Sequence, residues 1–554
     1  MEMGRPSIRL PRGLRDFPPE EMAKYSYVEG RIRRVLELYG YQEVRTPIFE
    51  RFDLFALRSG EEIRSRMFVF STDEGEMALR PELTAPIARM VATGKLDLSK
   101  KPLKLYYIGP CYRYDEPQAG RYREFWQAGV ELIGSPYPEA DAEVIRLAIR
   151  VLEELGLKDY VLRIGDMAIL RAFLAQEGVP EEVANRIIGP LDILTSSMDK
   201  LRLYRRKLTS KDQDRPLSPD ELSDLVRRCD EVRAWKEEEL SKMDLGESPI
   251  PVKYEALLEP DPRVYRLKEL YERGSFEEMC DIIDRKLTEL ALMLKLRWAY
   301  YGVSYEEEGE RKVYKMPEEV FDRLFKLIGI SGPKEEALKA LKDLLGTSGR
   351  LGEAISRFEE VLEALSWFGV GGEGYLVDMG IIRGLEYYTG MVFEVDIPFL
   401  GAQKQVCGGG RYDKLIEEFG GPSLPAVGFA FGIDRLVLAM ERYGVGLPTR
   451  PRCDIYVVPV SREVLGEAIR IAEGLRNSGL RAELSLSRKR LGEELSQADK
   501  LGARVAIIIG PRELASGKVV LRDLSKREQV LVDLGGLVEV VRAMLTGGRD
   551  AGAR

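Results

Sequence analysis

The stretch "LKLYYIGPCYRYDEPQAGRYREFWQAGVELIGS", residues 103–135, places two long apolar runs on either side of a short polar turn. The runs "LKLYYIGPCYRYDE" and "YREFWQAGVELIGS" are typical of β-strands, and "PQAG" between them is typical of a hairpin loop. Because a short hairpin joins antiparallel neighbours, this stretch predicts two paired antiparallel strands.

The residues before the hairpin predict a helix and then extended chain. Residues 20–39 have apolar side chains at helical spacing, and Gly40 ends the pattern. Residues 41–50 are extended in character but contain Pro47, which a central strand does not tolerate. Residues 77–91, "MALRPELTAPIARMV", also look like strand. A series of strands from 77 to 134 is therefore expected.

The residues after the hairpin alternate between helices and strands. Helical patterns cover 139–155 and 168–177, the latter after the short strand "YVLRIG". From about 185 to 366 the chain is dense in both charge signs and reads as long helices, which predicts a helical domain inserted into the first one. Strands resume at 374, and in 426–440 a strand leads into a helix.

A linker rich in Pro and Gly, "GVGLPTRPR" at 444–452, ends this region. Beyond it, short apolar strands and helices alternate as in a compact α/β domain. The last ten residues are expected to fray.

The length and composition set limits on the class of protein. A chain of 554 residues is too long for one core and should divide into three or four domains. Its formal charge of −8 argues against indiscriminate nucleic-acid binding, although a local basic patch is compatible with it. No signal segment or membrane span is recognisable, so a cytoplasmic location is expected.

Cysteine and histidine usage excludes several chemistries. The five cysteines are far apart and form no C-x-x-C pair, which predicts reduced thiols and no structural zinc. The chain has no histidine, so Ser-His-Asp and Cys-His nucleophile systems and the H-E-x-x-H zinc site are excluded. Any reaction must use other side chains, backbone dipoles or bound ions.

Three arginines follow or interrupt apolar runs, where a guanidinium needs an anion beside it: Arg113, Arg383 and Arg435. Arginine binds phosphate and carboxylate oxygens with two parallel hydrogen bonds, so their recurrence suggests a polyanionic ligand. The open alternative is a local ion pair with Asp115, Glu386 or Asp434, respectively.

A second set of polar residues, Glu82, Thr84, Gln127 and Glu131, supplies acceptors of the kind that an ammonium group needs. The alternative is that the two glutamates pair with nearby arginines. The loop "CGGGRYD", 407–413, has three successive glycines, which allow close approach of a ligand but are a weak signal alone. It matches neither the P-loop nor the dinucleotide motif.

Together these segments resemble a known family. The stretches 39–50, 112–131 and 428–436 resemble motifs 1, 2 and 3 of class II aminoacyl-tRNA synthetases. "RGLEYYTGMVFE" and "CGGGRYD" resemble the two signatures of the histidyl-tRNA synthetase family, and 453–545 is similar to its anticodon-binding domain. Motif 2 departs in one place, since Trp126 stands where many relatives would have histidine.

The resemblance implies an α+β catalytic domain with an antiparallel sheet flanked by helices, a helical insertion and a C-terminal α/β domain. The expected boundaries are 1–178 and 369–445 for the two catalytic parts, 179–368 for the insertion, and 453–545 for the anticodon-binding domain. It also implies a homodimer formed through motif 1.

The resemblance also implies the reaction, in which histidine and ATP form histidyl-adenylate and the aminoacyl group passes to the terminal ribose of tRNA(His), with Mg²⁺ bridging the phosphates. Arg113 and Arg383 would hold the α-phosphate and the histidine carboxylate, and Arg435 the ATP tail and adenine. Charge stabilisation and positioning then carry the catalysis.

By the same resemblance Glu131 accepts the imidazole N–H, with Tyr387 and Tyr388 completing the polar contacts, and Glu82, Thr84 and Gln127 hold the α-amino group. A site of this kind rejects other amino acids without editing. The acceptor end of tRNA would meet Gln118, Arg121 and Arg123, of which either arginine could serve ATP instead. Phosphates of the anticodon stem would meet Arg488, Lys489 and Arg490, which could equally be a solvated charged face.

Two alternatives to this reading have clear discriminators. A related regulatory subunit of histidine biosynthesis would typically lack the anticodon domain and the ATP arginines. A class II synthetase for proline, threonine or glycine would lack both histidyl signatures.

Overall fold

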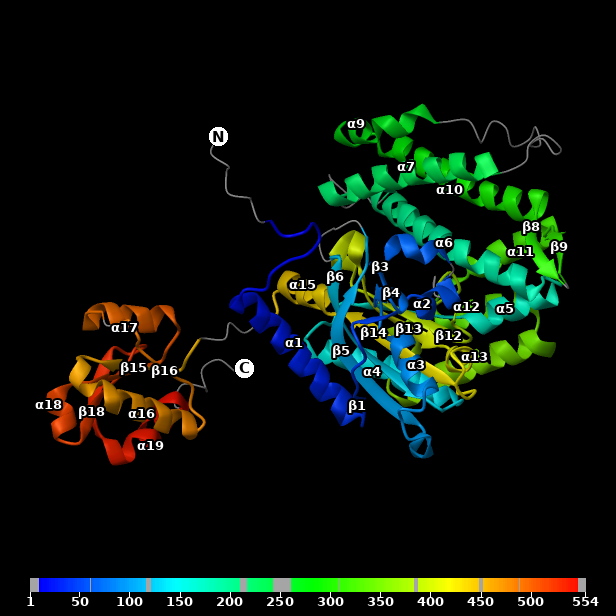
Figure 1. Ribbon diagram of the computed structural model, residues 1–554. Coiled ribbons are helices and arrows are strands. Elements are labelled where there is room, and N and C mark those ends of the chain that lie inside the picture. The colour runs from blue at the N-terminus through cyan, green and yellow to red at the C-terminus, as the bar shows by residue number, and fades with distance from the viewer. Residues whose placement is uncertain are drawn as a thin grey trace. The chain divides into compact units, whose positions relative to one another are not determined.

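The computed structural model describes residues 9–59, 61–115, 121–209, 217–242, 261–307, 309–382, 387–447, 452–487 and 489–546. The chain divides into two compact units, Met1–Leu447 and Pro448–Arg554, and Figure 1 shows the ribbon of each. No helix in the described ranges is long and apolar enough to cross a membrane.

A nine-stranded mixed sheet forms the centre of the first unit, and the hairpin predicted at 103–135 is part of it. Strands β5 and β6 pair antiparallel from Leu103 opposite Ile133 to Tyr112 opposite Glu124. The strand order is β1-β5-β6-β14-β13-β12-β7-β11-β10. Across the sheet these strands are β1 (Gln42–Glu43), β5 (Leu103–Tyr112), β6 (Glu124–Ile133), β14 (Ala426–Gly432), β13 (Gln405–Arg411), β12 (Met391–Asp396), β7 (Val161–Asp166), β11 (Leu376–Asp378) and β10 (Ser331–Gly332).

Helices cover the apolar face of this sheet. Val130 and Phe429 are paired across β6 and β14 and are buried on that face. Helix α4 (Pro138–Glu154) packs there, and Arg411 of β13 binds Asp141 of α4 through a buried pair at 2.8 Å. Helix α1 (Pro19–Leu38) packs on α4 and on α15 (Ile433–Tyr443), and α5 (Met167–Gln176) follows β7. The predicted helices and the predicted fold class are confirmed.

One element differs from its prediction. Within the stretch 77–91, which looked like strand throughout, only the first residues are strand (β4, Gly75–Leu79), and helix α3 runs over Thr84–Ala92. The carboxylate of Glu82 accepts hydrogen bonds from the backbone N–H groups of Thr84 at 2.5 Å and Ala85 at 3.0 Å. This side chain satisfies the first donors of the helix, which starts it against the strand-like composition.

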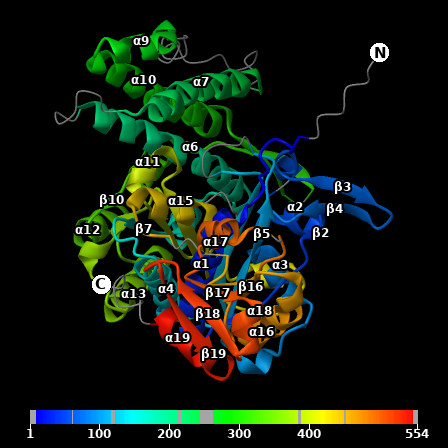
Figure 2. The same ribbon diagram turned by 90° about the vertical axis from the view of Figure 1, so that its left-hand side faces the viewer.

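The extended segment 41–50 lies at edges, as Pro47 predicts. Its first part forms β1, the outermost strand beside β5. Its last part leads into β2 (Phe49–Arg51), which pairs with β4 in a three-stranded sheet of order β2-β4-β3, where β3 is Val69–Thr72. Figure 2 shows the β3–β4 hairpin at the rim of the first unit. Helix α2 (Asp53–Ser59) follows β2.

The long stretch predicted as helical contains two groups of helices. The first group is α6, α7, α9 and α10 (Glu181–Thr209, Pro219–Lys242, Leu267–Glu272 and Phe276–Lys295), gathered away from the sheet in Figure 1. The second group is α11, α12 and α13 (Glu318–Ile328, Lys334–Leu345 and Gly349–Trp367), of which α13 packs on α4 and α5. Between the groups lies a hairpin that the sequence reading did not predict, β8 and β9 (Val303–Glu307 and Glu310–Tyr314).

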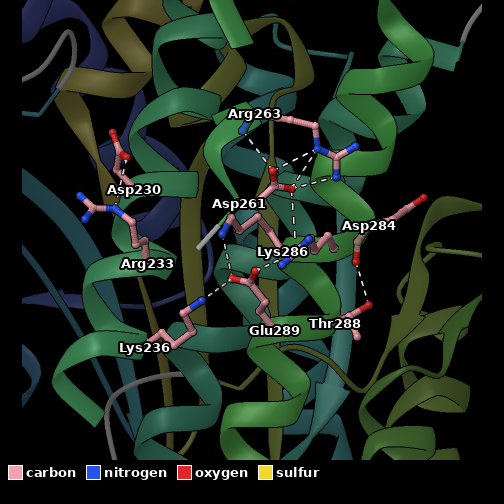
Figure 3. A network of polar contacts seen from close by, with 10 residues as sticks. Asp230, Arg233, Lys236, Asp261, Arg263, Asp284, Lys286, Thr288 and Glu289 are labelled. Carbon is pink, nitrogen blue, oxygen red and sulfur yellow. Dashed lines mark hydrogen bonds and ion pairs between the residues drawn. The ribbon is translucent and has the colours of Figure 1, made fainter. Parts of the chain in front are cut away.

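The first group of helices encloses a set of buried charges (Figure 3). Glu289 of α10 has no exposed surface and lies 2.7 Å from Nζ of Lys286 and 3.5 Å from Nζ of Lys236 in α7. A carboxylate withdrawn from water is tolerated when cations and hydrogen bonds compensate it. This cluster ties α7 to α10 within the first group of helices.

The second unit is the predicted α/β domain. Its five-stranded sheet has the order β16-β15-β17-β18-β19, with the first three strands parallel and the last two antiparallel. In chain order its elements are β15 (Ile455–Pro459), α16 (Leu465–Asn477), β16 (Ala482–Leu484), α17 (Leu491–Lys500), β17 (Val505–Ile509), α18 (Pro511–Ala515), β18 (Lys518–Asp523), β19 (Glu528–Asp533) and α19 (Leu537–Thr546).

Candidate active site

The face of the nine-stranded sheet opposite the apolar one carries small and polar side chains. In β6 the alternation of a strand places Gln127, Gly129 and Glu131 on this face. The register puts Glu131 opposite Gly428 of β14, and Gly428 opposite Gly410 of β13. Residues paired across antiparallel strands point to the same face. Two glycines, Gly428 on the next strand and Gly410 on the strand after it, therefore lie in a row on one side of Glu131.

Gly428 leaves the space that the Glu131 side chain occupies. A Cβ atom added at Gly428 would lie 1.9 Å from Oε2 of Glu131, and one added at Gly129 would lie 2.4 Å from the hydroxyl of Tyr107. Only glycine fits such close approaches. The glycines of "CGGGRYD", which the sequence suggested were a loop, lie in strand β13. The groups that come close to two of these glycines are mainly backbone and side-chain atoms of the neighbouring strands, whereas the sequence suggested a ligand.

Glu131 is held by two hydroxyl groups. The Thr84 hydroxyl donates to one carboxylate oxygen at 2.8 Å, and the Tyr412 hydroxyl donates to the other. Glu131 is buried, and burial raises the pKa of its carboxyl group to about 8. Within the described part of the chain no arginine forms an ion pair with Glu131 or Glu82, although the charge of Arg113 acts on Glu82.

Glu82 lies near this carboxyl group at the start of α3. Its oxygens accept the two backbone N–H bonds that cap the helix, and burial raises the pKa of Glu82. The fold thus brings Glu82, Thr84 and Glu131 to one place, although Thr84 and Glu131 are far apart in sequence. Acceptor oxygens converge there, as an ammonium ligand requires.

Aromatic and polar side chains surround this site. Tyr387 and Tyr388 are buried with ring centroids 4.8 Å apart, and the Tyr387 ring is 5.7 Å from that of Tyr412. Gln127 accepts a hydrogen bond from the thiol of Cys111 at 3.2 Å, on the same face. The two tyrosines and Gln127 therefore belong to the neighbourhood in which sequence reasoning placed the amino-acid ligand.

Arg113 continues this face beyond the end of β5. Its Nε donates to the backbone oxygen of Pro81 at 3.0 Å, and its guanidinium lies 5.0 Å from the Phe125 ring centroid. None of the described carboxylates forms an ion pair with it, and burial lowers the pKa of Arg113. Asp115, its alternative partner, is bound instead by Arg66 at 3.3 Å and Arg121 at 2.5 Å.

Arg66 and Arg121 therefore bind Asp115, and Arg113 and Arg435 lie close enough to Arg121 for their charges to interact. Burial is the main cause that lowers the pKa of Arg435 to about 10, and the positive charges of Arg121 and Arg113 contribute to this lowering. A buried guanidinium that loses hydration and meets like charges is stabilised by an anion. This cluster is built to receive a ligand with several negative charges.

Arg435 sits in the first turn of α15 and donates to the backbone oxygen of Gln405. Asp434, its alternative partner in the sequence reading, uses its carboxylate for Arg15, for the Tyr25 hydroxyl at 2.8 Å and for the backbone N–H of Trp126 at 2.8 Å. The carboxylate of Asp434 thus binds groups of α1 and β6.

Three predicted site residues, Arg383, Gln118 and Arg488, lie outside the described residues, as does Glu386. Arg123 donates to the backbone oxygens of Asp115 and Arg12, both at 3.3 Å, and stacks 4.1 Å from the ring centroid of Tyr114. In the second unit Lys489 and Arg490 are exposed just before α17.

Sequence reasoning missed Tyr412 and Arg66. Tyr412 lies inside the quoted signature "CGGGRYD", where only the glycines drew attention, and its hydroxyl reaches Glu131 across two strands. Arg66 lies in a short 3₁₀ segment, Glu61–Arg66, and no motif signals its contact with Asp115. Among the described residues no group of three or more Cys, Asp or Glu side chains is arranged to hold a metal ion.

Comparison with known proteins agrees with this geometry. The family model "Histidyl-tRNA synthetase" matches residues 13–200 and 308–436, and the model "Anticodon binding domain" matches residues 454–544. The curated "Histidine--tRNA ligase" of Pyrococcus abyssi is 35% identical over 541 residues, 97% of this chain and 99% of the relative. That of Methanocaldococcus jannaschii is 34% identical and covers 96% of this chain and 98% of the relative.

The chain belongs to the histidyl-tRNA synthetase family. The predicted family is thereby confirmed, and the matched stretches of the family model enclose the sheet and both of its polar clusters. The family model leaves out residues 201–307, which include most of the first group of helices.

Solved structures of histidyl-tRNA synthetases share the fold. The crystal structure from Nostoc sp. PCC 7120 has a TM-score of 0.62 at 22% identity, covering 97% of this chain and 99% of the other. The apo structure from S. aureus has a TM-score of 0.56 at 23% identity, covering 96% and 99%.

Proposed function

We infer that this protein is an aminoacyl-tRNA ligase that activates L-histidine with ATP and transfers it to the 3′-terminal ribose of tRNA(His). The observation that carries the mechanism is the pairing of two clusters on one sheet face. Arg66 and Arg121 bind Asp115 with Arg113 and Arg435 near them, and a buried carboxyl group held by hydroxyls lies at Glu131. One cluster suits a polyphosphate and the other an amino acid.

In the first step an oxygen of the histidine carboxylate attacks the α-phosphorus of ATP, and pyrophosphate leaves with the bonding electrons. We propose that Arg113 and Arg383 hold the α-phosphate and the carboxylate as charge builds between them. Arg435 holds the departing phosphates and the adenine, with Arg121 as a further phosphate contact. Support for this assignment of Arg113, Arg121 and Arg435 is that the three guanidinium groups lie close enough for their charges to act on one another, while Arg121 is bound by Asp115.

Histidine recognition is proposed at Glu131. The carboxylate accepts the N–H of a neutral imidazole, while Tyr388 and Tyr387 complete the polar contacts. Glu82, Thr84 and Gln127 receive the α-ammonium group. The support for this is the convergence of these side chains from α3, β6 and the segment before β12 on one face.

In the second step the 3′-terminal ribose oxygen attacks the carbonyl carbon of the adenylate, and AMP leaves. We propose that the acceptor end of tRNA meets Gln118 and Arg123, and that the anticodon stem meets the exposed segment with Arg488, Lys489 and Arg490. Cationic side chains next to a helix start suit phosphate contacts.

The remaining parts of the proposal concern ions and assembly. Mg²⁺ enters with ATP as an ion bound by phosphate oxygens, its preferred ligands. The protein forms a homodimer through motif 1 and works in the cytoplasm. The domain boundaries expected from the sequence are kept, with the insertion as a separate domain at 179–368.

Amino-acid-dependent ATP–pyrophosphate exchange with each of the twenty amino acids tests the first step. Exchange with histidine alone is expected, and aminoacylation of tRNA(His) should follow. Absence of exchange with every amino acid would instead support a regulatory protein that senses histidine.

The role of Arg383 has its own test. Replacing Arg383 by Ala should depress exchange strongly and leave tRNA binding in a filter assay unchanged. Normal exchange by this variant would remove Arg383 from the reaction.

A further inference from the structure

Arg163 lies in β7 and faces three carboxylates on neighbouring strands. Its guanidinium is 3.0 Å from Asp378, 2.7 Å from Glu394 and 3.1 Å from Asp396. The side chain is only 13% exposed. Register pairs Arg163 with Glu394, which lies on the same face as Gly408, two residues from Gly410. Arg163 is therefore on the face of the sheet that carries Glu131.

The carboxylates around Arg163 lie on β11, which precedes the first histidyl signature, and on β12, which contains the last residues of that signature. Asp378 ends β11 and accepts the backbone N–H of Gly380 at 3.0 Å, which fixes the start of the segment toward β12. Asp396 ends β12 and is also bound by Lys404 at 2.9 Å. One guanidinium thus joins the strand that enters this segment to the strand that leaves it.

A short chain of hydrogen bonds leads from Arg163 to the arginine cluster. Glu394 uses one oxygen for Arg163 and accepts the side-chain amide of Gln405 through the other at 2.6 Å. The backbone oxygen of Gln405 accepts the guanidinium of Arg435. The position and direction of the Arg435 guanidinium are therefore coupled to Arg163 through Glu394 and Gln405.

We propose that Arg163 is a positioning residue for adenylate formation, which sets the guanidinium of Arg435 through Glu394 and Gln405. The inference rests on the proposed function, since Arg435 is assigned there to the phosphates of ATP. Only arginine carries a planar set of donors that reaches three separate carboxylates at once. Lysine at this place keeps the charge but presents it from one nitrogen atom.

A double-mutant cycle separates positioning from mere stability. In the parent protein, Arg163→Lys should lower kcat/KM for ATP in histidine-dependent pyrophosphate exchange about tenfold. In the Arg435→Lys background the same substitution should cost less than about threefold, because Arg435 no longer presents the fork that Arg163 aligns. Equal losses in the two backgrounds would overturn the proposal.

A second substitution tests the same chain of hydrogen bonds without changing any charged residue. Gln405→Met removes the amide that reaches Glu394 and keeps the backbone oxygen for Arg435. It should lower kcat/KM for ATP at least about threefold, leave KM for histidine within about twofold, and be non-additive with Arg163→Lys. Unchanged kinetics would also overturn the proposal, even where the Arg163 variant fails to fold.

The control is Arg323→Gln, which removes a partly buried ion pair with Glu177 away from the sheet face. It should lower the melting temperature without changing kcat/KM for ATP. An equal kinetic loss in this control would assign the effect of Arg163 to stability. If the parent protein itself showed no histidine-dependent exchange, the proposed function would fail. That failure is distinct from a failure of the Arg163 proposal, which is seen only in the comparison of the variants with an active parent protein.

Discussion

Tyr412 donates its hydroxyl hydrogen bond to Glu131, which fixes the direction of the carboxylate that we assign to imidazole recognition. At the scale of single residues this contact is the most direct test of the site. Tyr412→Phe removes one donor and adds no bulk. KM for histidine should rise about tenfold, because the site loses a hydrogen bond that orients Glu131.

The matched control for Tyr412→Phe is Tyr106→Phe. The Tyr106 hydroxyl also binds a glutamate, Glu37 at 3.1 Å, but it lies on the apolar face of the sheet with α1. Pyrophosphate exchange should show an unchanged KM for histidine in this control. A similar rise in both variants would mean that Tyr412 acts on stability of the sheet rather than on the ligand.

The pKa of Glu131, raised to about 8 by burial, predicts a pH dependence of stability. Folding favours the protonated form, so its contribution is complete below the ordinary pKa of a glutamate and is lost as pH rises toward 8. Between these values the loss is at most about 1.4 kcal/mol per pH unit.

Thermal unfolding of the parent protein and of Glu131→Gln at several pH values measures this. The amide does not titrate, so the melting temperature of the parent should fall relative to the variant between pH 5 and pH 8. Parallel curves across this range would mean that Glu131 is ionised throughout, held by its two hydroxyl donors and by water.

At the scale of elements, the segment before α17 depends on a buried carboxylate. Glu494 accepts hydrogen bonds from the hydroxyls of Ser485 at 2.8 Å, Ser487 at 2.6 Å and Tyr456 at 3.2 Å, and from the backbone N–H of Lys489 at 2.8 Å. Above this anchor the segment is exposed, including a leucine, Leu486, at 85%. The segment thus presents cations and an apolar side chain from a fixed base.

Glu494→Ala should release this segment and raise KM for tRNA about tenfold in aminoacylation, while pyrophosphate exchange stays unchanged because the catalytic sheet lies in the other unit. Asp523→Ala is the control, since Asp523 holds another turn of the same unit through Ser525 and Lys526. An unchanged KM for tRNA in the Glu494 variant would place the anticodon contact elsewhere.

Elements also differ in how far the sequence predicted them. The hairpin β5–β6 was predictable because its apolar runs are long and its turn is polar. Helix α3 was not, because "MALRPELTAPIARMV" looks like one strand-rich stretch and the start of the helix depends on Glu82, which accepts two backbone N–H groups. The hairpin β8–β9 was hidden in a stretch of mixed charge, where no alternation distinguishes strand from helix.

At the scale of the whole molecule, the three-stranded sheet offers the surface for the proposed homodimer. Ile48, Phe49 and Phe70 are exposed there at 46%, 53% and 41%, and the two phenylalanine rings lie 5.9 Å apart. Ile48 and Phe49 belong to the motif 1 segment, and Phe70 belongs to β3. Exposed aromatic side chains that adjoin one another are typical of interfaces.

The double substitution Phe49→Glu with Phe70→Glu should raise the dimer dissociation constant at least about tenfold and shift the mass in light scattering toward the monomer. Trp367→Glu is the control, because Trp367 is similarly exposed but lies at the end of α13. A variant that stays dimeric at low micromolar concentration would exclude this sheet as the interface.

The sequence by itself determined the family, the main hairpin, the long helices and the types of residue at the site, because apolar period and signature motifs are local in the chain. The partners of the charged residues were decided by the tertiary structure. Asp115 binds Arg66 and Arg121 rather than Arg113, and Asp434 binds Arg15 rather than Arg435.

The physical reason is that strand register and helix packing, not proximity in sequence, set which charges meet. Glu131 reaches Thr84 and Tyr412 because β6 pairs with β14, because Gly428 leaves room, and because α3 begins at the same place. Each contact joins residues remote in sequence. The motifs therefore name the chemistry, and the packing of the sheet decides which oxygen and nitrogen atoms remain for the ligand.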